Sequence, residues 1–207
     1  MEFPFFIYNF ALVNGSLIIN INTIMAKLIE IFSYAGQGKS LVIVNKLLQS
    51  VNQEQKCLLI IDESEVTLYR ERMKKLCKDN DKLRQNCEVY VLCYTPLNNN
   101  EEILSKIKEI IKYKSKGIKF SSVFVDCIYA KPKREGKPNF LLQMELYKEV
   151  DNVIITEQLT YDATNHFVYG NCQYVCQKEG DVIIVEKLRD NTNNDIFTEE
   201  KEIIPII

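Results

Sequence analysis

A glycine-rich segment, SYAGQGKS at residues 33–40, carries the residue types that phosphate binding requires. Glycines allow backbone N–H groups to close around a polyphosphate, and a helix that begins here adds the positive end of its dipole. Lys39 would reach the β- and γ-phosphates of a nucleotide, and the Ser40 hydroxyl would ligate Mg²⁺. The segment therefore predicts a nucleotide-binding loop, which would consist of Ser33, Gly36, Gln37, Gly38, Lys39, Ser40 and Leu41.

The loop departs from the Walker A pattern at its first position, where the pattern has a glycine and this chain has Ser33. A glycine turn with a purely structural role is the competing interpretation. The surroundings favour phosphate binding, because a strand-like run at 27–32 precedes the loop and a helical stretch at 39–50 follows it.

Acidic residues that end two apolar runs could complete this chemistry. Asp126 ends one run, and we expect it to hold Mg²⁺ through water, although a turn-forming aspartate would give the same pattern. Glu63 follows another run, and we expect it to orient the water that attacks the nucleotide. Asp62 and Glu65 are alternatives for this base, and the whole acidic cluster could instead cap a helix.

The elements that must position these residues alternate between buried-strand runs and stretches of helical periodicity. The predicted strands lie at 27–32, 57–62, 88–94, 121–126 and 153–156, with two more near 167–176 and 181–188 that turn at Glu179-Gly180. The predicted helices lie at 39–50 and 65–78, in a long stretch opened by residues 98–102, and at 139–150. This alternation predicts an α/β domain with a mainly parallel central sheet flanked by helices, and with a late β-hairpin. Ligands bind such sheets at the carboxyl ends of the strands.

The apolar stretch at residues 1–24 has two interpretations. It could form an extra strand or a hairpin turning at Asn14-Gly15, or it could be sequence upstream of a natural start at Met25. It lacks the basic segment of a signal peptide, and asparagines interrupt it, so we expect no membrane span. Residues 25–207 would then form the nucleotide-binding domain.

Composition excludes several other functions. Lys+Arg total 26 and Asp+Glu total 28, which argues against a protein that coats nucleic acid through bulk positive charge but leaves a local basic patch open. His166 is the single histidine, so a multi-histidine metal site is excluded.

The seven cysteines are odd in number, and reduced thiols in a cytoplasmic protein fit them best. Cys172 and Cys176 could form half of a zinc site, but no second pair stands nearby.

Three further segments extend the pattern beyond the loop. The run at 59–72 places Glu63 after a strand and Arg72 on the helix that follows, and the strand at 153–156 leads through Glu157 to Gln158. A late strand ends in Lys187-x-Arg189. In this order, residues 27–191 resemble RecA-fold P-loop ATPases of the DnaB replicative-helicase type, with Asp190-Asn191 where that family has Asn-Gly.

The resemblance implies a RecA-like ATPase that binds ATP with Mg²⁺ and acts on single-stranded DNA, as the trimmed core of a phage or mobile-element helicase without a collar domain. Gln158 would sense the γ-phosphate, and Lys187 and Arg189 would act in trans within a homo-oligomer such as a hexameric ring. Two alternatives stay open: a non-motor nucleotide switch or scaffold, and a small-molecule kinase. The basic loop at 131–137 would fit a kinase lid, a DNA-facing loop or a solvated turn.

Overall fold

A computed structural model describes residues 9–13, 16–20, 27–62, 65–77, 80–92, 100–126, 149–158, 172–190 and 199–206. Its helices are α1 (Lys39–Asn52), α2 (Val66–Leu76), α3 (Asn80–Asn86) and α4 (Asn100–Lys114). Its strands are β1 (Asn9–Val13), β2 (Ser16–Asn20), β3 (Lys27–Ser33), β4 (Cys57–Asp62), β5 (Cys87–Leu92), β6 (Phe120–Asp126), β7 (Val150–Gln158), β8 (Cys172–Glu179), β9 (Val182–Asp190) and β10 (Lys201–Pro205).

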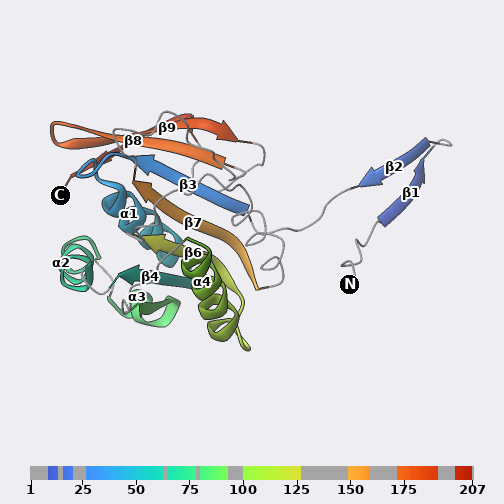
Figure 1. The fold of residues 1–207 in the computed structure, drawn as a ribbon, viewed down its shortest axis with the longest axis horizontal. Coiled ribbons are helices and arrows are strands. Elements are labelled where there is room, and N and C mark those ends of the chain that lie inside the picture. Colours follow the sequence, from blue (N-terminus) through green and yellow to red (C-terminus); the bar gives the residue numbers. More distant parts are fainter. Residues whose placement is uncertain are drawn as a thin grey trace.

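The main body is one eight-stranded sheet in the order β10-β9-β8-β3-β7-β6-β4-β5 (Figure 1). Neighbouring strands from β8 through β5 are parallel, whereas β9 and β10 are antiparallel to their neighbours. This confirms the predicted α/β fold with a mainly parallel sheet and a late antiparallel hairpin, which β10 extends into a three-stranded meander.

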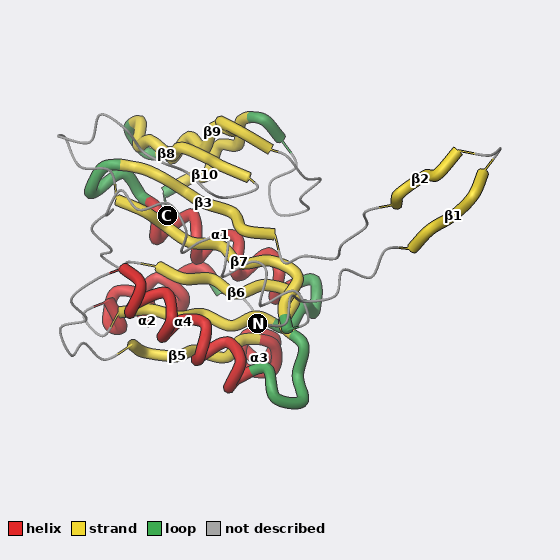
Figure 2. The backbone as a smooth tube through the Cα atoms, turned by 45° about the vertical axis from the view of Figure 1, so that its right-hand side comes forward, coloured by secondary structure: helices red, strands yellow, loops and turns green. Residues whose placement is uncertain are grey.

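Helices cover both faces of this sheet (Figures 1 and 2). The side chains of β4 explain why, because alternate residues of a strand point to opposite faces. Leu59 and Ile61 pack in the core beneath α1, while Leu58 and Ile60 pack with α4 on the other face. A strand buried on both sides must be apolar throughout, as the sequence of β4 is. The inner side of α4 is formed by Ile107, Ile110 and Ile111, which share one helix face.

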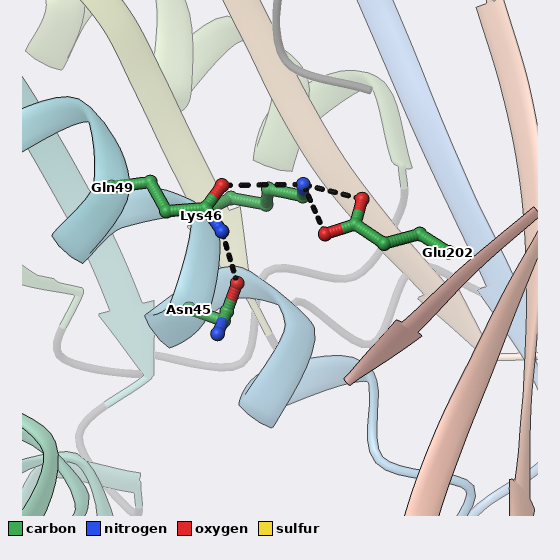
Figure 3. Close-up of polar contacts among 4 residues, drawn as sticks. All are labelled: Asn45, Lys46, Gln49 and Glu202. Carbon is green, nitrogen blue, oxygen red and sulfur yellow. Dashed lines mark hydrogen bonds and ion pairs between the residues drawn. The ribbon is translucent and has the colours of Figure 1, made fainter. Parts of the chain in front are cut away.

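A buried ion pair connects α1 to the last strand (Figure 3). Lys46 Nζ lies 2.5 Å from Glu202 Oε2 and 2.7 Å from Oε1, and it also donates a hydrogen bond to Gln49 Oε1 at 3.3 Å. The side chain of Lys46 is 5% exposed and that of Glu202 is 22% exposed. The C-terminal strand is therefore tied to the helix that follows the glycine-rich loop.

The structure differs from the sequence-based prediction at three elements. Val150, predicted as the end of a helix, begins β7 and pairs with Phe120, because its strand extends three residues before Val153. The short polar helix α3 and the strand β10 were not expected from the sequence. Residues 1–24 contain a hairpin whose strands pair Val13 with Ser16, but β1 and β2 form a sheet of their own and do not extend the main one.

Several predicted features fall outside the described residues. They are the turn at Asn14-Gly15, Glu63, residues 131–137, most of the helix predicted at 139–150, and His166. In the part of the chain that is described, no helix is both long and apolar enough to cross a membrane.

Candidate functional site

The ends of four parallel strands place the candidate residues along one edge of the sheet. In the register of β3 and β7, Ser33 is opposite Gln158. In the register of β4 and β6, Ile61 is opposite Asp126, so Asp62 comes next to it at the same edge. The loop that follows β3 leads directly into α1 at this edge. The structure thus brings the glycine-rich loop, Asp62, Asp126 and Gln158 to one edge.

The glycines of the loop adopt left-handed conformations. Gly36 has φ +77° and Gly38 has φ +93°, which L residues with side chains rarely adopt. A Cβ atom at Gly38 would also lie only 2.8 Å from Ile183 Cγ1 on β9. Gly38 is the N-cap residue of α1, and no side chain caps the helix. The backbone at the helix N-terminus is thus shaped by glycine and left without a side-chain acceptor, as anion binding requires.

Lys39 folds back over this loop. Its Nζ donates hydrogen bonds to the Ser33 carbonyl oxygen and to Ser33 Oγ, both at 3.0 Å, and to the Tyr34 carbonyl oxygen at 3.1 Å. Ser33 Oγ in turn donates to the Tyr34 carbonyl oxygen at 3.0 Å. Ser33 is 1% exposed, so its hydroxyl is a fixed part of the loop. The residue that departs from the Walker A pattern therefore contacts the lysine that would bind phosphate.

The loop also rests on the β8–β9 hairpin. The backbone N–H of Lys178 donates to Gln37 Oε1 at 2.9 Å, and the Cys176 thiol contacts the Gln37 carbonyl oxygen at 3.9 Å. With the contact of Gly38 against Ile183, these interactions join the loop to both strands of the hairpin. Sequence reasoning did not find Cys176, Lys178 or Ile183 as neighbours of the loop, because the contacts join segments about 140 residues apart.

The pKa of the Cys176 thiol is affected by residues of the glycine-rich loop and by Asp126. Burial raises the pKa of its thiol above the usual value, while a hydrogen bond to Ser33 and the positive charge of Lys39 lower it. The negative charge of Asp126 raises it further. The thiol is therefore neutral near pH 7.

The carboxylate of Asp126 is fully buried, with 0% exposure. The Tyr69 hydroxyl of α2 donates a hydrogen bond to its Oδ2 atom, and the Thr156 hydroxyl of β7 donates one to its Oδ1 atom. A solvated turn aspartate would not be held in this way. The carboxylate is instead fixed by two side chains from different elements.

Glu63 and the side chains of Asp62, Gln158 and Arg189 lie outside the described part of the structure. Ser40 is partly buried in the first turn of α1, and Leu41 is buried in the core beneath it. Arg72 lies on α2, and its Nη1 atom is buried with no hydrogen-bond partner among the described residues.

Lys187 and Arg189 lie far from the loop of their own chain. Ile183 on β9 touches Gly38, and β9 runs away from the loop toward the opposite end of the sheet, where Arg189 pairs with Gln173. At roughly 3.3 Å per strand residue, Lys187 is about 13 Å and Arg189 about 20 Å beyond Ile183. Neither residue can be expected to serve the loop of the same chain.

Within the described residues, no group of three or more His, Cys, Asp or Glu side chains is placed to hold a metal ion. Cys172 and Cys176 are buried cysteines on one strand, β8. Ser40 and Asp126 offer a hydroxyl and one carboxylate, a donor set that fits Mg²⁺ only when nucleotide phosphates supply further oxygens.

No family model matches this chain, and no curated protein matches it. Function is therefore inferred from the geometry of the loop, the buried carboxylate and the sheet edge. That geometry supports a proposal about phosphate chemistry.

Proposed function

We propose that this chain binds and hydrolyses ATP with Mg²⁺ at residues 33–41, as a RecA-like P-loop ATPase. The observation that carries the proposal is the position of Lys39 Nζ, which lies across a loop of two left-handed glycines at the uncapped N-terminus of α1. A polyphosphate would offer this ammonium stronger acceptors than the carbonyl oxygens of Ser33 and Tyr34. Lys39 would exchange these contacts for phosphate oxygens.

The other candidate residues would have separate roles around the phosphates. Bound Mg²⁺ would neutralise negative charge on the phosphate oxygens, and Ser40 with the buried Asp126 would hold it. Glu63 would accept a proton from the attacking water or orient it, with Asp62 and Glu65 as the alternatives. Gln158, opposite Ser33 at the sheet edge, would contact the terminal phosphate.

A second chain would have to complete the site. Lys187 and Arg189 are too far along β9 to reach their own loop, so they could stabilise phosphate charge only in a neighbouring subunit. We therefore propose a homo-oligomer, of which a hexameric ring of the DnaB type is one form. The same geometry also fits an ordinary strand end with solvated side chains.

The proposed DNA partner has support from α4. Residues 105–119 contain one acidic side chain, Glu109, and six lysines: Lys106, Lys108, Lys112, Lys114, Lys116 and Lys119. Tyr113 is 65% exposed among them, and Lys116 Nζ lies 5.5 Å from the centre of its ring. Since the whole chain has a net charge of −2, this segment is a local concentration of positive charge, in which Lys106, Lys114 and Lys119 form ion pairs with Glu109, Glu88 and Asp151. Lysines beside an exposed aromatic ring suit single-stranded nucleic acid, whose phosphates and bases they can contact together.

A nucleotide-binding switch that does not translocate is the second candidate. It is favoured by the hydrogen bond between Lys39 and Ser33 Oγ, because Lys39 must break this bond before it can bind phosphate, which lowers the affinity for phosphate. A motor and a switch differ in whether single-stranded DNA stimulates ATP turnover.

Calorimetric titration of the full chain with ATP, ADP and AMP tests the proposal. ATP and ADP should bind, and AMP should not, because the loop recognises a polyphosphate. Lys39→Ala should abolish binding while leaving the thermal unfolding temperature unchanged, and Lys82→Ala on α3 is a matched control with an exposed lysine. If AMP binds as well as ATP, or if Lys39→Ala binds ATP like the wild type, the phosphate-loop assignment is wrong.

A further inference from the structure

Tyr69 is the single buried residue of α2 among those whose side chains are described. It is 2% exposed, its ring belongs to the core beneath α1, and its hydroxyl donates to Asp126 Oδ2. Val66, Met73 and Leu76 of the same helix are partly buried against this core, so Tyr69 is the most deeply buried member of the face that α2 turns to the sheet. Thr156, 3% exposed, holds the other carboxylate oxygen from β7.

The hydroxyls of Tyr69 and Thr156 do not use the full hydrogen-bonding capacity of the Asp126 carboxylate. A carboxylate has about four lone-pair sites, two on each oxygen, and each hydroxyl uses one. A buried carboxylate must have hydrogen-bond donors, and two donors on opposite oxygens also fix its rotation. The remaining lone pairs are then held in a defined direction, ready to accept from a metal-bound water.

We propose that Tyr69 and Thr156 are positioning residues that hold Asp126 for the magnesium-nucleotide complex, and that Tyr69 links α2 to the metal. This inference rests on the proposed function.

A purely structural role for Tyr69 predicts something different. If the hydroxyl only stabilises the packing of the core, its loss should lower stability and weaken nucleotide binding with and without metal. If the hydroxyl positions Asp126, metal affinity should fall while the affinity for metal-free nucleotide is retained. Partners that orient a metal-binding group typically change metal affinity by about tenfold to a hundredfold.

The experiment compares the full wild-type chain with Tyr69→Phe, Thr156→Val and Thr156→Ser. Tyr90→Phe is the matched control, since that tyrosine lies on the edge strand β5 and packs against the core on the α4 face. Binding of Mn²⁺ to the protein–ATP complex is measured by electron paramagnetic resonance, and binding of ATP in EDTA by calorimetry. We expect Tyr69→Phe and Thr156→Val to weaken Mn²⁺ retention at least about tenfold. Thr156→Ser, which keeps the hydroxyl, and Tyr90→Phe should behave like the wild type, and all four variants should bind metal-free ATP normally.

The outcomes separate this inference from the proposed function. A wild-type chain that binds no ATP overturns both. Normal ATP binding with unchanged Mn²⁺ retention in Tyr69→Phe and Thr156→Val overturns the positioning role alone, as does an equal loss of metal-free ATP binding. If Tyr69→Phe does not fold, the contrast between Thr156→Val and Thr156→Ser decides, because both keep the tyrosine.

Discussion

Lys39 Nζ and Ser33 Oγ are joined by a 3.0 Å hydrogen bond inside the glycine-rich loop. The hydroxyl occupies the position where the Walker A pattern has no side chain. It gives the lysine one acceptor beyond the two backbone carbonyl oxygens that it also contacts. A ligand that needs Lys39 must replace this contact, so the serine should weaken phosphate binding.

Ser33→Ala should therefore bind ATP more tightly than the wild type. Loss of one hydrogen bond from the free state is worth about 1 kcal/mol, or roughly fivefold in affinity. Calorimetric titration with ATP measures the change, and alanine is preferred to glycine because it adds no backbone freedom. Weaker ATP binding in Ser33→Ala would contradict this prediction and would make the hydroxyl a direct contributor to phosphate binding.

The ion pair of Lys46 and Glu202 should contribute to stability (Figure 3). Glu202→Ala leaves a buried ammonium without its carboxylate partner, which costs about 2 kcal/mol after allowance for the partial exposure of Glu202. Chemical denaturation followed by circular dichroism gives the free energy of unfolding.

The exposed pair of Lys201 and Glu186 provides a matched control at the same meander. Glu186→Ala should change the free energy of unfolding little, because exposed pairs are screened by water. Lys46→Met combined with Glu202→Leu should recover most of the loss, since it removes both charges together. An equal effect of Glu186→Ala and Glu202→Ala would mean that burial of the pair adds nothing.

The basic surface of α4 should determine binding of single-stranded DNA. Lys112→Glu combined with Lys116→Glu reverses two charges beside the exposed Tyr113, and it should weaken binding of a labelled thymidine oligonucleotide at least about tenfold at low salt. Fluorescence anisotropy measures the affinity. Lys74→Glu with Lys75→Glu makes the same charge change in the last turn of α2 and should have a much smaller effect. Equal losses in both double variants would indicate a general charge effect and remove α4 as the DNA-binding surface.

Much of the fold was predictable because its signals are local. Unbroken apolar runs predict strands buried on both faces, and β4 and β6 follow them closely. Two elements had weaker signals. α3 is seven residues long and mostly polar, and β10 alternates an exposed Ile203 with a buried Ile204 only because β9 lies beside it.

The candidate site was predictable only in part, because only some of its signals are local in the sequence. Spacing identifies the loop and Asp126, since each follows a strand. The packing of Gly38 against Ile183 and the hydrogen bond from Tyr69 to Asp126 join residues far apart in the chain, and no spacing rule encodes them. Cys172 and Cys176 illustrate this limit. Their spacing suggests half of a zinc site, and only the structure shows that Cys176 lies against the loop.

The last prediction concerns Arg189, whose backbone lies at the far end of β9 from its own loop. If Arg189 acts on a neighbouring subunit, ATP turnover per chain should rise with protein concentration as oligomers form. Arg189→Ala and Lys39→Ala should each be nearly inactive alone, because the first lacks the shared arginine and the second lacks a working loop.

Mixing these two variants should restore part of the activity. In a mixed oligomer, an Arg189→Ala subunit keeps its loop and receives the arginine of a Lys39→Ala neighbour. Phosphate release over a range of mixing ratios should therefore pass through a maximum, and a mixture of Lys39→Ala with Lys39→Ala,Arg189→Ala serves as the inactive control. If turnover per chain is constant across protein concentration and every mixture stays inactive, Arg189 is not shared between subunits. The late strand would then end in ordinary solvated side chains, and the chain would act as a single nucleotide-binding domain.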